Sequence, residues 1–207
     1  VVVGLIPKPA GGERPIGLLP MLFRWWDKTR RGVMSSWSRE HAGFWDTAVA
    51  GSSALRSALV ANFCTEAAVA RGDACASIFW DMQAFYDSIH LPSLCRRSLE
   101  LHIHPVVLML HMQMCLCPRL LKAEGGYSEV LTAFTSLIAG AGPAIDFTRA
   151  MLYPVLESAQ RRHEGVAITS FVDDLRQRCE GRAMWVCSSL VAAGARLAEA
   201  LRDSRLV

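Results

Sequence analysis

The sequence predicts an α/β layered fold, in which apolar strands are covered by helices. Two runs rich in apolar, β-branched and aromatic residues, "ACASIFWDM" (74–82) and "VAITSF" (166–171), have the composition of strands buried on both faces. The segment 183–203 repeats apolar residues at helical spacing, on a face made of Val186, Leu190, Ala193, Leu197 and Leu201. Strands interspersed with amphipathic helices are typical of a layered domain.

The start of the chain predicts a hairpin followed by two helices. "VVVGLIPK" (1–8) and "IGLLP" (16–20) are the two extended pieces, and the Gly- and Pro-containing "PAGGERP" lies between them. "MLFRWWDKTRR" (21–31) has helical spacing, with cations toward its end as the helix dipole favours. Ser52 or Ser53 is the expected N-cap of a further helix that runs to about Ala70.

Helices and one hairpin are expected between the two apolar strands. "LPSLCRRSLEL" (91–101) is a short helix with proline in its first turn, and Pro105 opens another helix, "PVVLMLHMQMCLC". "RLLKAEGGYSEVLTA" (119–133) has the pattern of a hairpin around Gly125 and Gly126. "DFTRAMLYPVLESAQRR" (146–162) is a helix that we expect to bend near Pro154.

Composition indicates a folded intracellular protein. The 207 residues are 52% apolar, with a net charge of +3 that says little about partners. Seven cysteines, with no CxxC pair, fit reduced thiols better than a disulfide framework. The start has no features of a signal peptide, and the longest weakly polar run, 131–145, is too rich in Gly and Pro to span a bilayer. We therefore expect no membrane association, and a location in the nucleus or the cytoplasm.

Carboxylates stand where burial should exclude them, at the ends of both apolar strands. "SIFWD" ends in Asp81 and "ITSFVDD" ends in Asp173 and Asp174. Such groups are costly unless paired, and a divalent cation is a strong partner. Because adjacent strand residues point to opposite faces, we expect Asp173 as the main ligand and Asp174 as a secondary one.

Carboxylates around one site suit two Mg²⁺ ions about 3.5–4 Å apart, the arrangement used for phosphoryl transfer. On spacing alone, a surface Asp-Asp turn with an unrelated strand-end Asp81 remains an alternative.

Several segments, in the same order along the chain, resemble the reverse transcriptase family. "DMQAFYDSI" (81–89) is similar to the family's first catalytic motif and "FVDD" (171–174) to its Asp-Asp hairpin. "LIPKPAGGERPIGLLP" (5–20) resembles the fingers segment of non-LTR retroelement and group-II-intron-like enzymes. "GFWDTAVAGSSALRSAL" (43–59) stands in the place of the fingers helix, and "LIAGAGPAIDFTRAMLYPVL" (137–156) in that of the glycine motif. The resemblance covers nearly the whole chain.

The resemblance implies a right-hand polymerase fold, with fingers at 1–72 and most of an antiparallel, helix-covered palm sheet at 73–207. Catalytic and metal-binding roles fall on Asp81, Asp173 and Asp174, which would hold two Mg²⁺ ions or Mn²⁺ instead. Residues implied to bind substrate are Lys8 and Arg14 at the triphosphate, Tyr86 as a steric gate against the 2′-hydroxyl, and Gly140 or Gly142 beside the template–nucleotide pair.

The implied function is RNA-directed DNA polymerisation in a mobile retroelement. Such an enzyme adds deoxynucleoside triphosphates to a DNA primer on an RNA template, and it grips the hybrid duplex mainly through its backbone. Because the fragment stops before the thumb, it is expected to hold a duplex poorly by itself. Oligomeric state does not follow from the sequence.

The glycine segment departs from the family pattern. Relatives commonly have Pro-Gln-Gly there, whereas this chain has "IAGAGPA", without the glutamine. Two alternatives therefore remain: a catalytically decayed remnant that only binds nucleic acid, and an RNA-dependent RNA polymerase, which the aromatic Tyr86 disfavours. There are also simpler interpretations of two substrate-binding candidates: Lys8 is then a solvated cation, and Tyr86 a residue of the core.

Overall fold

A computed structural model describes residues 1–9, 11–123 and 125–206, which form two compact units. The first unit combines Val1–Glu40 with Ala84–Met151, and the second combines His41–Gln83 with Leu152–Val207. The chain therefore passes from one unit to the other three times. These interleaved units are not the consecutive segments expected, 1–72 and 73–207, and the assignment of fingers and palm stays a prediction.

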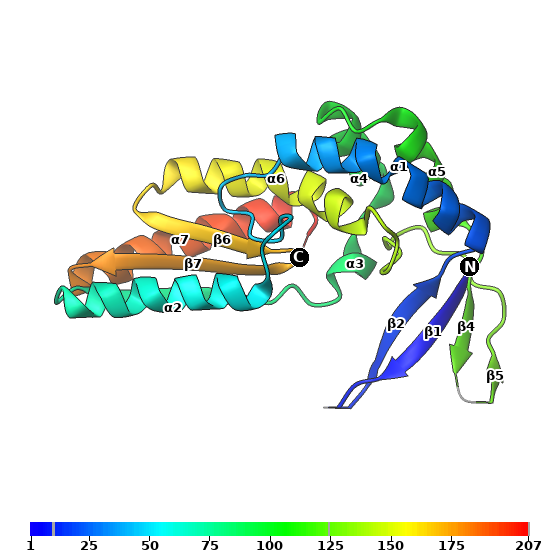
Figure 1. Ribbon diagram of the computed structural model, residues 1–207. Coiled ribbons are helices and arrows are strands. Elements are labelled where there is room, and N and C mark those ends of the chain that lie inside the picture. Colours follow the sequence, from blue (N-terminus) through cyan, green and yellow to red (C-terminus); the bar gives the residue numbers. More distant parts are fainter. Residues whose placement is uncertain (10, 124, 207) are drawn as a thin grey trace. The chain divides into compact units, whose positions relative to one another are not determined.

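The first unit contains a four-stranded sheet in the order β2-β1-β4-β5 (Figure 1). Strand β1 (Val2–Pro7) pairs antiparallel with β2 (Glu13–Leu18) and parallel with β4 (Leu120–Ala123), and β4 pairs antiparallel with β5 (Gly126–Tyr127). Both expected hairpins are therefore present. The parallel β1–β4 pair joins segments far apart in the sequence, which local patterns do not reveal.

Helices of the first unit enclose its apolar core. They are α1 (Met21–Glu40), the short α3 (Phe85–Ser88), α4 (Leu91–Glu100) and α5 (Pro105–Leu116). Proline occupies the first turn of α4 and of α5, as expected, because its missing N–H is no loss there. Fully buried side chains include Phe85, Ile89, Leu94, Ile103 and Phe147.

The second unit contains a three-stranded antiparallel sheet in the order β3-β7-β6. Its strands are β3 (Ala74–Trp80), β6 (Val166–Phe171) and β7 (Asp174–Gly181). Its helices are α2 (Ala54–Ala70), α7 (Ala183–Asp203) and the C-terminal part of α6 (Ala144–Arg162), which begins in the first unit and carries Pro154 inside. The mixed α/β fold with an antiparallel, helix-covered sheet is confirmed.

Helix α7 packs its apolar stripe on the sheet. Val186, Leu190 and Ala193 form a buried cluster with Val166 and Cys179, and the expected face continues through the buried Leu197 and Leu201. Gly194 lets α7 approach closely, because a β-carbon there would lie 3.0 Å from Ile78 Cδ1. By length and composition, α7 is also apolar enough to cross a membrane, and it is the one such helix among the described residues. Here one of its faces covers a sheet.

Strand β3 differs from the expectation in its burial. We predicted an apolar strand buried on both faces, but Phe79 is 73% exposed. The reason is alternation along the strand: Ile78 and Trp80 face α7, whereas Phe79 points to the opposite side. The N-terminus of α2 does agree with the sequence, since Ser53 caps it by accepting a hydrogen bond from the Arg56 backbone N–H.

Candidate functional site

The β6–β7 hairpin places the Asp-Asp pair at the end of the three-stranded sheet. Phe171 pairs with Asp174, so Val172 and Asp173 form a two-residue turn. On the other side of β7, Trp80 pairs with Leu175. Asp81 directly follows Trp80, at the end of β3 where β7 begins. Asp81 lies close enough for its negative charge to act on Asp174, and the catalytic and metal-binding roles of Asp81, Asp173 and Asp174 stay a prediction.

The turn of this hairpin holds a β-branched residue in an unfavourable backbone conformation. Val172 has a φ of 61°, a region that β-branched residues rarely adopt. A positive φ at the first turn residue is the pattern of a type II′ hairpin turn, which normally takes glycine there. The Ser170 hydroxyl donates a hydrogen bond to the Val172 carbonyl oxygen at 3.3 Å, which helps to hold the turn.

The carboxylates at the sheet end repel one another. Partial loss of solvent raises the pKa of Asp174, and the negative charges of Asp173 and Asp81 raise it further. Three carboxylates supply the oxygen ligands that Mg²⁺ prefers, and a divalent cation would relieve their repulsion. In the described part of the chain, however, no three His, Cys, Asp or Glu side chains converge closely enough to hold a metal ion. The residue types fit magnesium, while their side chains are not gathered around a common point.

Strand β3 is fixed beside the hairpin by a buried side-chain contact. The Trp80 indole Nε1 donates to Gln177 Oε1 at 3.0 Å, and Gln177 is only 1% exposed. Buried amides are costly unless they are hydrogen-bonded, so this contact favours one register of β3 on β7. It therefore also fixes the position of Asp81, the residue that follows Trp80.

A loop segment supports the free edge of β6 at the same end of the sheet. Asp46 forms a parallel bridge with Ser170, and the Ser170 backbone N–H donates to the Trp45 carbonyl oxygen at 2.8 Å. The Thr47 backbone N–H and Oγ1 both donate to the Ser170 carbonyl oxygen. The hairpin that carries the Asp-Asp pair is thus held from both sides.

The residues expected to bind substrate belong to the first unit. Lys8 directly follows β1, where its backbone pairs with Gly11 and Gly12, and Arg14 lies in β2 opposite Ile6. Both side chains are exposed at the tip of the β1–β2 hairpin. Their role in binding a triphosphate stays a prediction.

Tyr86 lies in α3, a helix too short to be expected from sequence periodicity. Its carbonyl oxygen accepts a hydrogen bond from the Leu137 N–H at 2.8 Å, and its ring meets the Phe85 ring edge to face. Beside it, Ser136 donates through Oγ to Asp87 Oδ1, and Arg119 donates to Ser136. The backbone that carries Tyr86 is therefore tied to the segment that leads into the glycine motif.

Gly140 and Gly142 are required for different reasons. Gly140 has a φ of 97°, a conformation that favours glycine. Gly142 has no such φ, but its N–H donates to Asp27 Oδ2 at 3.1 Å, and a β-carbon there would overlap that carboxylate. Each glycine therefore has its own structural role.

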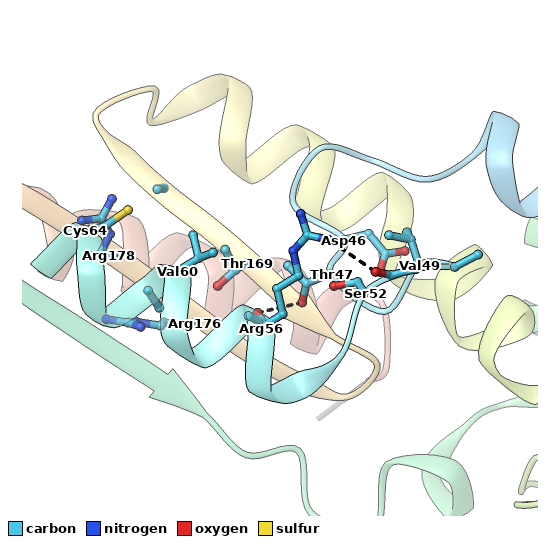
Figure 2. Close-up of a pocket in the computed structure, with 15 residues that line it drawn as sticks. Asp46, Thr47, Val49, Ser52, Arg56, Val60, Cys64, Thr169, Arg176 and Arg178 are labelled. Atoms are coloured by element: carbon cyan, nitrogen blue, oxygen red, sulfur yellow. Dashed lines mark hydrogen bonds between the residues drawn. The ribbon is translucent and has the colours of Figure 1, made fainter.

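Sequence reasoning missed Asp27 and the arginines of a cavity in the second unit. Asp27 Oδ1 lies 3.5 Å from Nε2 of the buried His111 on α5, so one carboxylate contacts both the glycine motif and a helix. The cavity is lined by Arg56, Arg176 and Arg178, of which the first is far from the other two in the sequence (Figure 2). The placement of Arg176 and Arg178 two residues apart on one strand was the signal available for that pair.

Comparison with solved structures shows that the fold is similar to that of telomerases. Apo telomerase from Candida tropicalis, truncated from its C-terminal domain, matches with a TM-score of 0.58 and 12% identity over 93% of this chain and 45% of that chain. Telomerases from Candida tropicalis and Candida albicans, each in complex with a TWJ fragment of telomeric RNA, match with TM-scores of 0.63 and 0.58 and identities of 11% and 12%. These two matches cover 96% of this chain and 38% and 39% of those chains.

The chain thus spans less than half the length of the telomerases that it matches. No family model matches the sequence, and no curated protein matches it. At this level of identity the likeness shows the fold alone. This fold agrees with the one that the resemblance to the reverse transcriptase family implies.

Proposed function

We propose that this chain is the fingers and palm part of an RNA-directed DNA polymerase of a mobile retroelement, of the non-LTR or group-II-intron-like branch. The observation that supports the proposal is the pairing of β3 with β7, which brings the end of β3, directly followed by Asp81, to the end of the sheet that carries the Asp-Asp turn. The order of the motifs along the chain and the likeness of the fold to telomerase structures support it. Its partners would be an RNA template, a DNA primer and deoxynucleoside triphosphates, and its reduced thiols fit an intracellular location.

The three carboxylates would hold Mg²⁺, or Mn²⁺ in its place. When bound, the metal supplies charge that lowers the pKa of a primer hydroxyl and stabilises the leaving pyrophosphate. The chain supplies the rigid end of a sheet: the Trp80–Gln177 hydrogen bond holds Asp81 in place, and the segment around Asp46 holds the hairpin. A prepositioned set of carboxylates avoids the cost of reorganising it at the moment of reaction.

Binding of the nucleotide would fall to the first unit. Lys8 and Arg14 provide exposed cations for the triphosphate, one as a point charge and the other as a planar fork. Tyr86 would exclude a 2′-hydroxyl by packing, since its backbone is held by Leu137. Gly140 and Gly142 would let the backbone approach the template–nucleotide pair without a side chain between them.

Primer extension on an RNA template by the full-length protein tests the proposal. Asp81→Asn and Asp173→Asn should each lower the extension rate by about a hundredfold or more, because each removes charge from a main metal ligand, and Asp174→Asn should lower it less. Asp203→Asn, at the exposed C-terminal end of α7, is the matched control and should extend normally. A rate for Asp81→Asn within a factor of two of the unmodified protein would falsify the proposal.

A second candidate is a remnant that binds nucleic acid but no longer extends primers. The absence of a gathered metal-binding set among the described residues and the missing glutamine near Gly140 favour it. In that case the unmodified protein would bind an RNA–DNA hybrid with a steep dependence on salt, and it would extend no primer with either Mg²⁺ or Mn²⁺.

A further inference from the structure

A cavity of about 350 Å³ lies in the second unit, between α2 and the face of the sheet that points away from α7 (Figure 2). The sheet contributes Thr169 from β6 and Arg176 and Arg178 from β7, whereas α2 contributes Arg56 and Cys64. Alternation along β7 puts Arg176 and Arg178 on one face, the face that also carries Asp174. The size is within the range of cavities that bind small ligands.

Positive charge in this cavity exceeds negative charge. Its lining includes three arginines and one carboxylate, Asp46, whose Oδ1 accepts a hydrogen bond from the Ala48 backbone N–H. Arg178 is neutralised by Glu180 at 2.8 Å. Arg176 instead donates to the Ser77 hydroxyl and lies 5.1 Å above the Phe79 ring, and Arg56 donates to the Gly51 carbonyl oxygen. Within the described ranges, neither Arg56 nor Arg176 has an acidic partner.

The partners of these two arginines are neutral groups, so their positive charge is not balanced by a carboxylate. Loss of solvent and the neighbouring positive charge of Arg178 lower the pKa of the Arg176 guanidinium. Arg56 is in the first turn of α2, which contains no acidic residue, so its charge adds to the positive end of the helix dipole. An anion that enters the cavity would supply the negative charge that these arginines do not find in the described residues.

A second cavity continues the first toward the carboxylates. It measures about 300 Å³ and shares Thr47, Ser57, Ala61, Thr169 and Arg176 with the first. Its other walls include Asp174, Phe171 and the exposed ring of Phe79. The two cavities together have cations at one end and aromatic rings at the other. A single-stranded nucleic acid can use both, because cations bind its phosphates and aromatic rings stack on its bases.

We infer that this double cavity binds phosphate groups of a single-stranded nucleic acid, with Arg56 and Arg176 contacting the backbone and Phe79 offering a stacking surface. The identity of the ligand as a strand rests on the proposed function, whereas the anion site rests on the arginines alone. A free nucleotide carries the same phosphate chemistry and is the other possible source of it. Binding requires neither metal nor primer extension.

Fluorescence anisotropy with a short labelled single-stranded RNA measures the binding. Arg56→Gln and Arg176→Gln should each weaken affinity by roughly fivefold to tenfold. Each should also reduce the slope of log K against log salt by about 0.7, because every phosphate that a protein neutralises on a single strand contributes that amount. Arg202→Gln, which removes an exposed arginine from the last turn of α7, is the control and should change neither the affinity nor the salt slope. Arg56→Gln is decisive if Arg176→Gln fails to fold, because Arg56 is exposed on α2.

Affinities of the same variants for RNA and for a nucleoside triphosphate distinguish the two sources of phosphate, a nucleic acid strand and a free nucleotide. If the arginine variants lose affinity for a nucleoside triphosphate but bind RNA as before, the strand assignment is overturned. If Arg56→Gln binds RNA, nucleotide and inorganic pyrophosphate like Arg202→Gln does, the anion site is overturned as well. Asp81→Asn should still bind RNA in either case. If the unmodified protein binds RNA through these arginines but never extends a primer, the polymerase proposal is refuted and the RNA-binding proposal stands.

Discussion

At the scale of single residues, Gly142 shows how a side chain of one helix can decide the residue type in a distant loop. Its N–H donates to Asp27 Oδ2, and the space where a β-carbon would stand is filled by that carboxylate. The sequence suggested one essential glycine and left Gly140 and Gly142 as alternatives. Local spacing could not separate them, because the side chain that requires Gly142 comes from α1.

Gly142→Ala should therefore destabilise the protein by about 1–3 kcal/mol, since Asp27 must move and its hydrogen bond is broken. Urea unfolding measures the change. Gly32→Ala is the matched control: nothing lies within 4 Å of a β-carbon there, and alanine inside α1 should stabilise by about 0.5–1 kcal/mol. Changes of the same sign in both variants would contradict this account.

His111 predicts a dependence of stability on pH. The residue is 1% exposed and packs against Phe23 and Phe147, and its burial lowers its pKa despite the nearby charge of Asp27. Below the ordinary histidine pKa of about 6.5, the unfolded chain binds a proton that folded His111 does not. Unfolding free energy should therefore fall as the pH decreases from 7 to 5.

His111→Phe keeps an aromatic ring in this place and removes the titration. The difference in unfolding free energy between the two proteins, measured by urea titration at several pH values, should shift in favour of the variant as the pH falls. Its slope should not exceed about 1.4 kcal/mol per pH unit, the limit for one proton. A difference that stays constant between pH 7 and pH 5 would show that His111 does not contribute to the pH dependence.

At the scale of elements, the sequence predicted those helices and strands whose signals are local. Ser53 begins α2, Ala70 ends it, and the buried stripe of α7 matches the apolar spacing residue by residue. Local signals could not provide the register of β3 on β7, because it depends on the pairing of segments about a hundred residues apart. Sequence patterns predicted Asp81 and the Asp-Asp pair as neighbours, and the choice of Asp173 as the main ligand with Asp174 as a secondary one stays a prediction.

The β6–β7 hairpin carries strain that a substitution can relieve. Val172 has a positive φ, which costs an L-residue about 1–2 kcal/mol, whereas asparagine tolerates this region. Val172→Asn should raise the unfolding free energy by about 1 kcal/mol, seen as a higher midpoint in thermal denaturation. Val172→Ile keeps the branched side chain and should leave the midpoint unchanged, so an equal rise in both variants would exclude backbone strain as the cause.

At the scale of the whole molecule, mutual repulsion of carboxylates predicts stabilisation by a metal. Binding to the folded state alone raises stability by RT ln(1 + [L]/Kd), about 2.7 kcal/mol at a hundredfold excess over Kd. The thermal midpoint should therefore rise with Mg²⁺ in the unmodified protein and in Asp203→Asn, and rise much less in Asp81→Asn and Asp174→Asn. An equal rise in all four proteins would place the bound metal elsewhere.

The division of the chain into interleaved units affects how it folds during synthesis. His41–Gln83 belongs to the same unit as Leu152–Val207, so β3 leaves the ribosome long before β7, its only ladder partner within the described residues. At about 5–20 residues per second, residues up to 207 follow Gln83 by roughly 6–25 s. During that time the apolar β3 has an unpaired edge, which is prone to aggregate. A chain cut at the boundary between residues 72 and 73 would leave neither unit complete.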